Sequence, residues 1–203
     1  MIVLVREGLL DKEMNIELER TYSEVIYRRL YFGGFPSWIH WEMWVKRVAG
    51  WGGQSLTVVD LTTSKEKEEH KLEIPDAIRF ESWRTKYGVT VDRHTFPIPD
   101  NQVPVDTAAF EHFLTFLGNR YKKEISCGNP MIIHCKGGHG RSAMVTIGML
   151  YRASFPTRDI HDVMNVITQI HHLRRDIHPK YLKQLCPTSA CQRVFLKKSL
   201  APG

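Results

Sequence analysis

The pattern of hydrophobic and polar positions predicts alternating strands and helices in the first half of the chain. Two short β-prone pieces fill residues 24–33 and end at a Gly-Gly-Phe-Pro turn. A helix with Ser37 as its cap is predicted over residues 37–48. Its buried stripe is expected to consist of Trp38, Trp41, Trp44 and Val45. Residues 55–61 are predicted as a buried strand, and residues 89–96 as another that ends where two prolines force a loop.

The second half of the pattern is mainly helical. Thr107 is predicted to cap a helix over residues 107–123, with Phe110, Phe113, Leu114 and Leu117 on its apolar face. A short apolar strand at 131–134, a glycine-rich turn and a helix at 141–154 follow. Thr157 is expected to open a further helix, and one or two shorter helices follow it. This order predicts an α/β fold whose central, mostly parallel sheet is flanked by helices.

Organisation along the chain indicates one domain. No repeat, low-complexity tract or linker divides the sequence, so we expect a single domain over residues 1–203 with a basic helical end from about residue 171. The run 65–71 mixes charges of both signs and is predicted as a solvated loop or helix turn.

Composition narrows the class of protein. The chain has 203 residues, 42% hydrophobic and 25% charged, which is typical of a soluble globular protein. Its longest apolar stretch, residues 144–151, is shorter than the ~20 residues of a membrane helix. The N-terminal sequence lacks the pattern of a secretory signal, so we expect a cytoplasmic location, with the nucleus left open.

Cysteine and charge add two expectations. A reducing compartment favours a catalytic cysteine over a disulfide among Cys127, Cys135, Cys186 and Cys191. Cys186 and Cys191 lack a second pair that would complete a metal site, so no metal is predicted. The net charge is +6, and from residue 171 onward seven Lys or Arg oppose one Asp. A basic end suits phosphopeptides, inositol lipids or RNA, and equally a solvated surface.

The glycine-rich turn after residue 134 carries the chemistry. Cys135 and Arg141 are separated by five residues and lie between an apolar strand and a helix N-terminus. The intervening residues are Lys136, Gly137, Gly138, His139 and Gly140. Glycines let successive backbone N–H groups turn toward one point, and the helix N-terminus adds partial positive charge there. The turn therefore predicts a site for a phosphate dianion.

The same electric field favours an ionised cysteine. Helix N-termini and nearby cations stabilise a thiolate, so Cys135 is expected to be a nucleophile at neutral pH. Arg141 is expected to give two parallel N–H donors to two phosphoryl oxygens. Ser142 is expected to donate a hydrogen bond to the sulfur, and His134 to orient the loop. Lys136 and His139 line the loop, either as substrate-binding residues that add positive charge or as solvated side chains.

The segment from His134 to Ser142 resembles the phosphate loop of the cysteine-dependent protein tyrosine phosphatase superfamily, in its dual-specificity branch. Residues 28–37 are similar to the opening hairpin of that branch, 56–62 to its next core strand, 96–104 to its general-acid loop and 188–193 to its glutamine segment.

The resemblance implies a mechanism without metal or other cofactor. Cys135 would attack phosphorus, Arg141 would bind the phosphoryl group, and Asp100 would protonate the leaving oxygen. Gln192 would position the hydrolytic water. Among nearby carboxylates, Asp92 falls in a predicted strand and Asp106 precedes a helix, whereas Asp100 lies on a loop able to close over phosphate.

Some features depart from the family pattern and leave the substrate open. Ala143 stands where a glycine is common, and residues 65–87 form a longer stretch than the compact plan needs. A phosphorylated protein is the expected substrate, with phosphotyrosine, phosphoserine and phosphothreonine all admitted. Phosphoinositide, RNA 5′-triphosphate and a non-catalytic phosphate-binding module are the alternatives. The sequence leaves the oligomeric state open.

Overall fold

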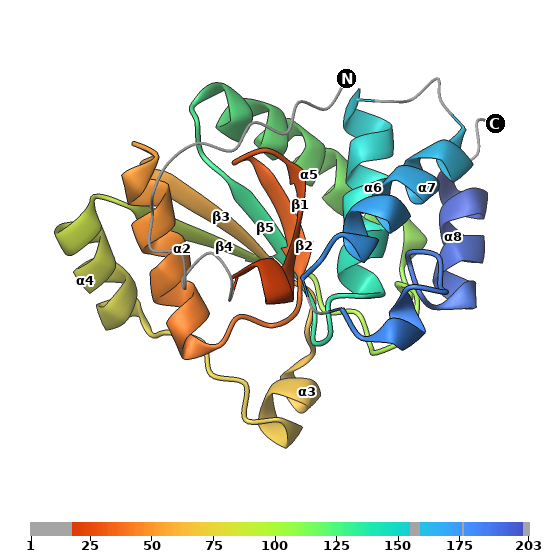
Figure 1. The fold of residues 1–203 in the computed structure, drawn as a ribbon, viewed down its shortest axis with the longest axis horizontal. Helices are drawn as coiled ribbons and strands as arrows, with labels where there is room; N and C mark the ends of the chain where they lie inside the picture. The colour runs from red at the N-terminus through yellow and green to blue at the C-terminus, as the bar shows by residue number, and fades with distance from the viewer. Residues whose placement is uncertain (1–17, 155–158, 176, 201–203) are drawn as a thin grey trace.

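A five-stranded sheet forms the centre of the computed structural model, which describes residues 18–154, 159–175 and 177–200 (Figure 1). The strands lie in the order β1-β2-β5-β3-β4. They are β1 (Tyr22–Ile26), β2 (Leu30–Gly33), β3 (Ser55–Asp60), β4 (Thr90–Thr95) and β5 (Met131–His134). Only β1 pairs antiparallel with its neighbour; the other pairs are parallel. The predicted α/β class with a mostly parallel sheet is confirmed.

Helices cover both faces of this sheet (Figure 1). They are α2 (Trp38–Gly50), α3 (Ser64–Glu69), α4 (Ala77–Tyr87), α5 (Thr107–Ser126), α6 (Arg141–Ser154), α7 (Ile160–His172), the 3₁₀ turn η1 (Pro179–Tyr181) and α8 (Ala190–Leu200). Helices α2 and α4 pack on one face, and α5, α6, α7 and α8 on the other.

Alternation along the central strand divides the core in two. On β5, Met131 and Ile133 point into the cluster formed with α5 to α8, whereas Ile132 points into the cluster formed with α2 and α4. Successive side chains of a strand point to opposite faces, so a strand buried on both faces is a continuous apolar run. The strand predicted at 131–134 has the observed bounds.

Register brings the carboxyl ends of three parallel strands together. His134, the last residue of β5, pairs with Gly33 of β2 and with Asp60 of β3. Ligand sites in such sheets lie beyond the carboxyl ends of the strands. The loop that follows β5 therefore leaves the sheet between its two neighbours, at the edge where a site is expected.

Three predictions need correction. The cap of α5 is Asp106, whose side chain accepts from the backbone N–H of Ala109 at 2.9 Å, so Thr107 is the first helical residue. Trp38 is 40% exposed, whereas the other three residues of the predicted stripe, Trp41, Trp44 and Val45, are buried. The run 65–71 is largely helical, as the helix-turn alternative has it, but its Glu66 is buried rather than solvated.

The C-terminal half largely follows the predicted order. Helix α6 has the predicted bounds. Thr157 lies outside the described residues, and α7 begins at Ile160 with Asp159 as its cap. The predicted shorter helices of the basic end are η1 and α8. The single-domain organisation stays a prediction.

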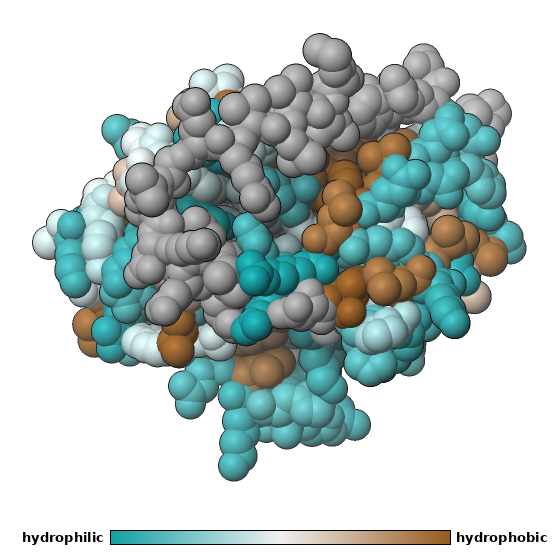
Figure 2. Space-filling model, in the orientation of Figure 1, coloured by the Kyte–Doolittle hydropathy of each residue, from teal (hydrophilic) through white to brown (hydrophobic). Residues whose placement is uncertain are grey.

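The surface of one face is mostly hydrophilic, with hydrophobic atoms gathered over the region of α7 and η1 (Figure 2). Within the described ranges, none of the helices has the length and apolar character needed to cross a membrane.

Candidate active site

The loop after β5 is held against the turn that follows β2. Gly137 forms an isolated bridge with Gly34, and the backbone N–H of Phe35 donates to the carbonyl of Lys136 at 3.0 Å. Gly138 has a φ of +77°, and a Cβ there would lie 2.3 Å from the backbone nitrogen of Gly34. No other residue fits this position without displacing the backbone. Gly138 is therefore needed both for the positive φ of the loop and for the close contact with the backbone of Gly34.

Cys135 lies at the base of this loop, where β5 ends. Its side chain is buried, and the backbone N–H of Gly138 donates to Sγ at 3.3 Å. The hydroxyl of Ser142 lies 3.5 Å from the same sulfur. Helix α6 begins at Arg141, so its N-terminal partial charge faces this region. The sulfur thus accepts one backbone hydrogen bond and lies beside a hydroxyl group at the start of a helix.

Arg141 is paired through both of its Nη atoms, whereas its buried Nε has no hydrogen-bond partner among the described residues. It is 1% exposed, and its Nη1 donates to the carbonyl of Ile98 at 2.7 Å. Its Nη1 and Nη2 also donate to the two carboxylate oxygens of Glu66, each at 2.7 Å. Burial by itself would lower the pKa of Arg141, but the Glu66 carboxylate, with Cys135 and Asp100 nearby, leaves the pKa raised. The guanidinium is fixed in orientation and stays charged.

Glu66 was missed by the sequence reasoning, which placed it in a solvated run. The residue is buried, and its carboxylate also accepts from the backbone N–H of Thr63 at 3.0 Å. Burial raises the pKa of Glu66, but hydrogen bonds from Arg141 and Thr63 outweigh it, so the pKa is lowered. The signal was present: Thr63, two residues and then Glu66 form a capping box, which marks a helix start.

Asp100 reaches the loop from the segment after β4. Its Oδ1 accepts from Arg141 Nη2 at 3.0 Å, and its side chain is 53% exposed. The buried Ile98 anchors this segment, because its N–H donates to the carbonyl of Leu61 at 3.1 Å. The loop therefore sets one partly exposed carboxylate beside Arg141.

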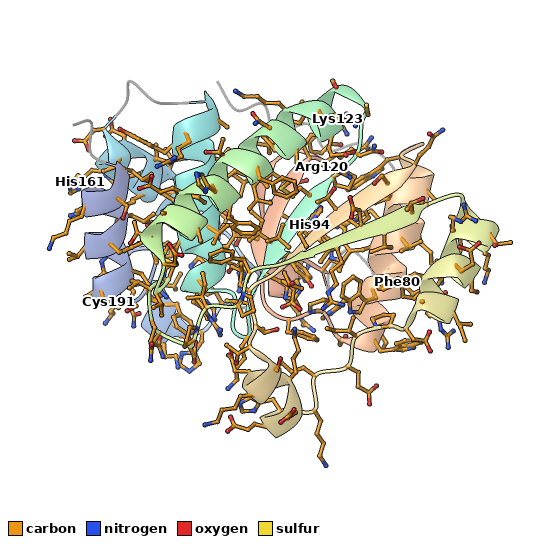
Figure 3. All side chains as sticks on the ribbon, turned by 180° about the vertical axis from the view of Figure 1, so that it is seen from behind. Phe80, His94, Arg120, Lys123, His161 and Cys191 are labelled. Carbon is orange, nitrogen blue, oxygen red and sulfur yellow. The ribbon has the colours of Figure 1, made fainter. Side chains whose placement is uncertain are left out.

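The other two carboxylates considered in the sequence have different partners. Asp92 pairs with Arg120 at 2.5 Å and with His94 at 3.4 Å. Both of these partners are labelled in Figure 3. Asp106 caps α5. Neither carboxylate has a hydrogen bond or ion pair with Arg141 among the described residues.

Gln192 on α8 packs against the loop from the other side. It is fully buried, and its Nε2 donates to the carbonyl of Gln102 at 2.7 Å. A Cβ on Gly140 would lie 2.8 Å from its Oε1. Within the described part of the chain this Oε1 has no hydrogen-bond partner. The side chain therefore brings an unpaired acceptor to the loop, and links it to the segment that carries Asp100.

His134 and His139 are both neutral. Burial lowers the pKa of His134 to about 4, with Asp60 opposing the shift from 4.0 Å. His139 stacks on Tyr181 with ring centroids 3.7 Å apart, and its Nδ1 lies 2.8 Å from Nε2 of His171. Burial, with the Arg174 and Lys180 cations, lowers the pKa of His139 to about 3. The expectation that His139 adds positive charge to the loop is therefore wrong.

The basic residues near the loop have distinct surroundings. Lys136 Nζ lies 2.6 Å from Nε2 of His70, at the end of α3. Arg174 is buried rather than solvated, and its Nη2 donates to the carbonyl of Gly138 at 3.0 Å. Arg193 donates to the carbonyls of Pro187 and Thr188 at 2.6 and 2.8 Å. The basic end is thus partly a structural support of the loop, which the charge count did not reveal.

Two of the remaining cysteines contact the segments around the site: Cys191 Sγ donates to the carbonyl of Asn101 at 3.1 Å, and Cys186 Sγ to the carbonyl of His139 at 3.9 Å. Cys127 and Cys191 are exposed free thiols, and burial raises the pKa of Cys186 to about 12. Among the described residues there is no group of three His, Cys, Asp or Glu side chains placed to hold a metal ion.

A strand, a glycine-rich anion loop with a buried cysteine, and a helix define a class of phosphate-binding α/β proteins. The family model of protein-tyrosine phosphatase matches residues 51–184, and the chain belongs to that family. The predicted membership of the superfamily is confirmed, and with it the class of cysteine-dependent phosphatases.

Solved structures share the fold across nearly the whole chain. A mutant form of Tk-PTP has a TM-score of 0.56 at 20% identity and covers 90% of this chain and 95% of its own. Kinase associated phosphatase has a TM-score of 0.56 at 17% identity, covering 90% and 96%. PTPMT1 in complex with PI(5)P has a TM-score of 0.52 at 18% identity, covering 89% and 97%.

A curated relative matches a shorter stretch. "Putative tyrosine phosphatase 197R" of Invertebrate iridescent virus 6 is 41% identical over 56 residues, which is 28% of this chain. The match spans about a fifth, 21%, of the length of that relative.

Proposed function

We propose that the protein hydrolyses phosphomonoesters by transferring the phosphoryl group to Cys135. The thiolate attacks phosphorus, an S–P bond forms and the bond to the leaving oxygen breaks. Asp100 gives its proton to that oxygen, so the alcohol leaves neutral. Arg141 holds two phosphoryl oxygens while negative charge spreads over them. The arrangement of Cys135, Arg141 and Asp100 around one loop is the observation that carries this proposal.

The second step returns the enzyme to its starting state. Water attacks the phosphorus of the phosphocysteine, the S–P bond breaks, and inorganic phosphate forms. Asp100 accepts the water proton, and the Ser142 hydroxyl, 3.5 Å from the sulfur, stabilises the departing thiolate. We assign the unpaired Oε1 of Gln192 to the orientation of that water, since a buried acceptor beside the loop requires a donor.

A phosphorylated protein is the substrate we propose first. We propose that the site admits phosphoserine and phosphothreonine as well as phosphotyrosine. Family membership supports this reading without distinguishing the three residues.

A phosphoinositide is the second candidate. PTPMT1, which shares the fold, is described in complex with PI(5)P, and Lys136 places a cation at the loop of this chain. An RNA 5′-triphosphate has less support, because Arg193 of the basic end is engaged by two backbone carbonyls. We retain the cytoplasm as the proposed location.

One comparison tests the proposal. Turnover of phosphotyrosine and phosphothreonine peptides, an inositol lipid and an RNA triphosphate is measured at matched pH and salt. Acid quenching during turnover should trap a phosphoenzyme in the wild type and none in Cys135→Ser. If the wild type turned over none of these substrates but bound inorganic phosphate, the result would favour the non-catalytic phosphate-binding module.

A further inference from the structure

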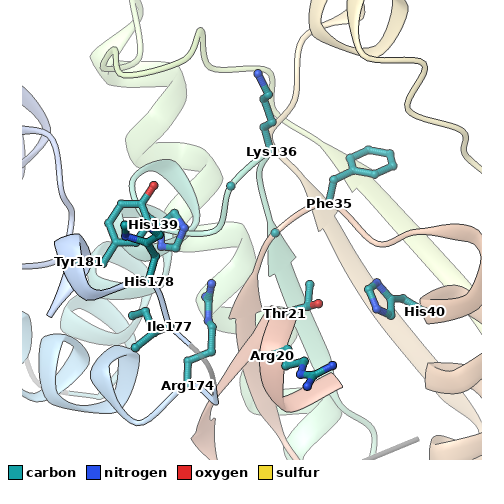
Figure 4. A pocket seen from close by; sticks show the side chains of 12 residues that line it. Arg20, Thr21, Phe35, His40, Lys136, His139, Arg174, Ile177, His178 and Tyr181 are labelled. Carbon is teal, nitrogen blue, oxygen red and sulfur yellow. The ribbon is translucent and has the colours of Figure 1, made fainter. Parts of the chain in front are cut away.

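A basic cavity adjoins the catalytic loop on the side of the C-terminal segment (Figure 4). Its volume is about 320 Å³, within the range of small-molecule sites. The wall is shared with the loop at Lys136, Gly137 and His139. The other lining residues are Arg20, Thr21, Gly34, Phe35, His40, Arg174, Ile177, His178 and Tyr181.

The lining has a strongly uneven charge. Arg20, Lys136 and Arg174 are cations, and none of the twelve lining residues is an Asp or Glu. Arg174 is 7% exposed, and its Nε has no hydrogen-bond partner within the described ranges. A buried guanidinium N–H without a partner is costly, which favours an anionic ligand. In Figure 4 the guanidinium points toward the space between His139 and Thr21.

Exposed leucines, which we call the leucine rim, lie on the segments that carry the lining residues Arg174 and Tyr181. Leu173, Leu182 and Leu185 are 76%, 47% and 51% exposed. Leu173 precedes Arg174 at the end of α7, and Leu182 follows Tyr181 at the end of η1. The two segments are tied together, because His172 Nε2 lies 3.0 Å from the carbonyl oxygen of Tyr181. Hydrophobic atoms gather over this region in Figure 2.

Further cations lie on the same segments as the leucines. Arg175, Lys180 and Lys183 are exposed, and Arg175 pairs with Glu19 at 3.9 Å. Exposed leucines are unfavourable in water, but beside cations they suit the boundary between lipid headgroups and acyl chains. Basic clusters and basic pockets are the features that bind anionic and inositol phosphate headgroups.

We propose that this cavity and its leucine rim dock the protein on an anionic membrane surface, with a phosphorylated lipid headgroup in the cavity. The leucines enter the interface, and Lys180 and Lys183 face the anionic lipids. A catalytic loop that shares a wall with the docking cavity then lies at the membrane surface. This goes beyond phosphoryl transfer, and it holds whether the hydrolysed substrate is a protein or a lipid.

Vesicle flotation tests the docking surface. The full chain carrying Cys135→Ser, which prevents turnover, is mixed with neutral phosphatidylcholine vesicles or with vesicles that contain phosphatidylserine or phosphatidylinositol phosphate at matched surface charge. Binding should follow the order inositol phosphate, serine, neutral. Lys180→Gln and Lys183→Gln should each weaken binding about fivefold, the effect of one cation at such a surface. Leu173→Ser and Leu182→Ser should each weaken it several-fold.

Matched controls separate docking from general effects. Val105→Ser changes a residue that is 93% exposed in another loop, and it should leave flotation unchanged. A soluble inositol bisphosphate should compete with the inositol lipid, whereas a free phosphatidylserine headgroup should not. The proposal would be overturned by equal binding to the two anionic vesicles or by no binding to any vesicle. It would also be overturned if a doubly phosphorylated peptide, and not the inositol bisphosphate, competed with the inositol lipid. Because flotation needs no turnover, its failure is distinct from failure of the proposed phosphatase activity.

Discussion

Both Nη atoms of Arg141 donate to the two carboxylate oxygens of Glu66, each at 2.7 Å, across 75 residues of sequence. A bidentate pair of this kind fixes the plane of the guanidinium as well as its position. Glu66 itself is held by the capping box at the start of α3. The local helix start therefore sets the orientation of the arginine that the mechanism requires.

This pair leads to a prediction for Glu66. Glu66→Gln keeps the shape but gives up the ionic partner, so the Arg141 guanidinium becomes less well oriented. We expect kcat to fall about tenfold or more while KM changes less, because the paired donors act mainly in the transition state. Steady-state kinetics checks this. Glu69→Gln, on the exposed side of the same helix, is the matched control and should behave as wild type. An equal effect of both substitutions would contradict a positioning role for Glu66.

The proposed role of Arg141 is to supply two parallel N–H donors to the phosphoryl group. Arg141→Lys keeps the charge and loses the fork, so we expect kcat/KM to fall on the order of 10² or more, nearly as far as in Arg141→Ala. Kinetics with a small aryl phosphate measures it. Near-native activity of the lysine variant would mean that the residue acts only as a diffuse charge.

Cys135 is predicted to be the thiol whose alkylation abolishes activity. Its sulfur accepts from the backbone N–H of Gly138 and lies at the base of the loop, near the N-terminus of α6. Iodoacetate at neutral pH should inactivate the protein, and phosphate or vanadate should protect it. Mass spectrometry locates the label. Cys127→Ser, which removes an exposed thiol, is the control and should leave the inactivation rate unchanged. Equal labelling of Cys127 without loss of activity would contradict the prediction.

Asp100 is predicted to matter most for poor leaving groups. Asp100→Ala should slow hydrolysis of phenyl phosphate by roughly 10² to 10⁴, the usual contribution of a general acid, and slow a nitroaryl phosphate much less. Asp106→Ala is the comparison, because Asp106 caps α5 and should affect stability rather than leaving-group dependence. The opposite result would move the acid to Asp106.

Acid should destabilise the fold through buried neutral histidines. The pKa of His134 is lowered to about 4 by burial, whereas the unfolded chain protonates near 6.5, so the unfolded state binds more protons between these values. Stability is therefore complete above about pH 6.5 and falls as the pH drops toward 4. At pH 5 the loss from His134 is about 2 kcal/mol.

Urea denaturation at pH 7 and pH 5 measures that loss. His139 and His171, whose pKa values burial lowers to about 3, add to it in the same direction. His134→Asn removes one site of protonation and should reduce the difference between the two pH values. An unchanged difference in this variant would show that His134 makes no contribution.

The sequence by itself determined the elements and the centre of the site. Apolar runs of four to six residues specify strands buried on both faces, and the bounds of β5 and α6 follow from the apolar run and the glycines between them. The loop from Cys135 to Arg141 consists of consecutive residues, so its ability to bind phosphate through backbone N–H groups could be predicted from the residue types alone. Its family resemblance is confirmed.

Only the tertiary structure decided which distant side chains meet that loop. Glu66 lies in a run whose charges look solvated, yet the fold carries α3 to Arg141, and burial turns a surface carboxylate into a paired one. Arg174 belongs by composition to a basic end, yet it packs under Gly138. The sequence gives the number of charged side chains in a segment. Whether each of these side chains is exposed, and which group it pairs with, depends on packing between segments far apart in the chain.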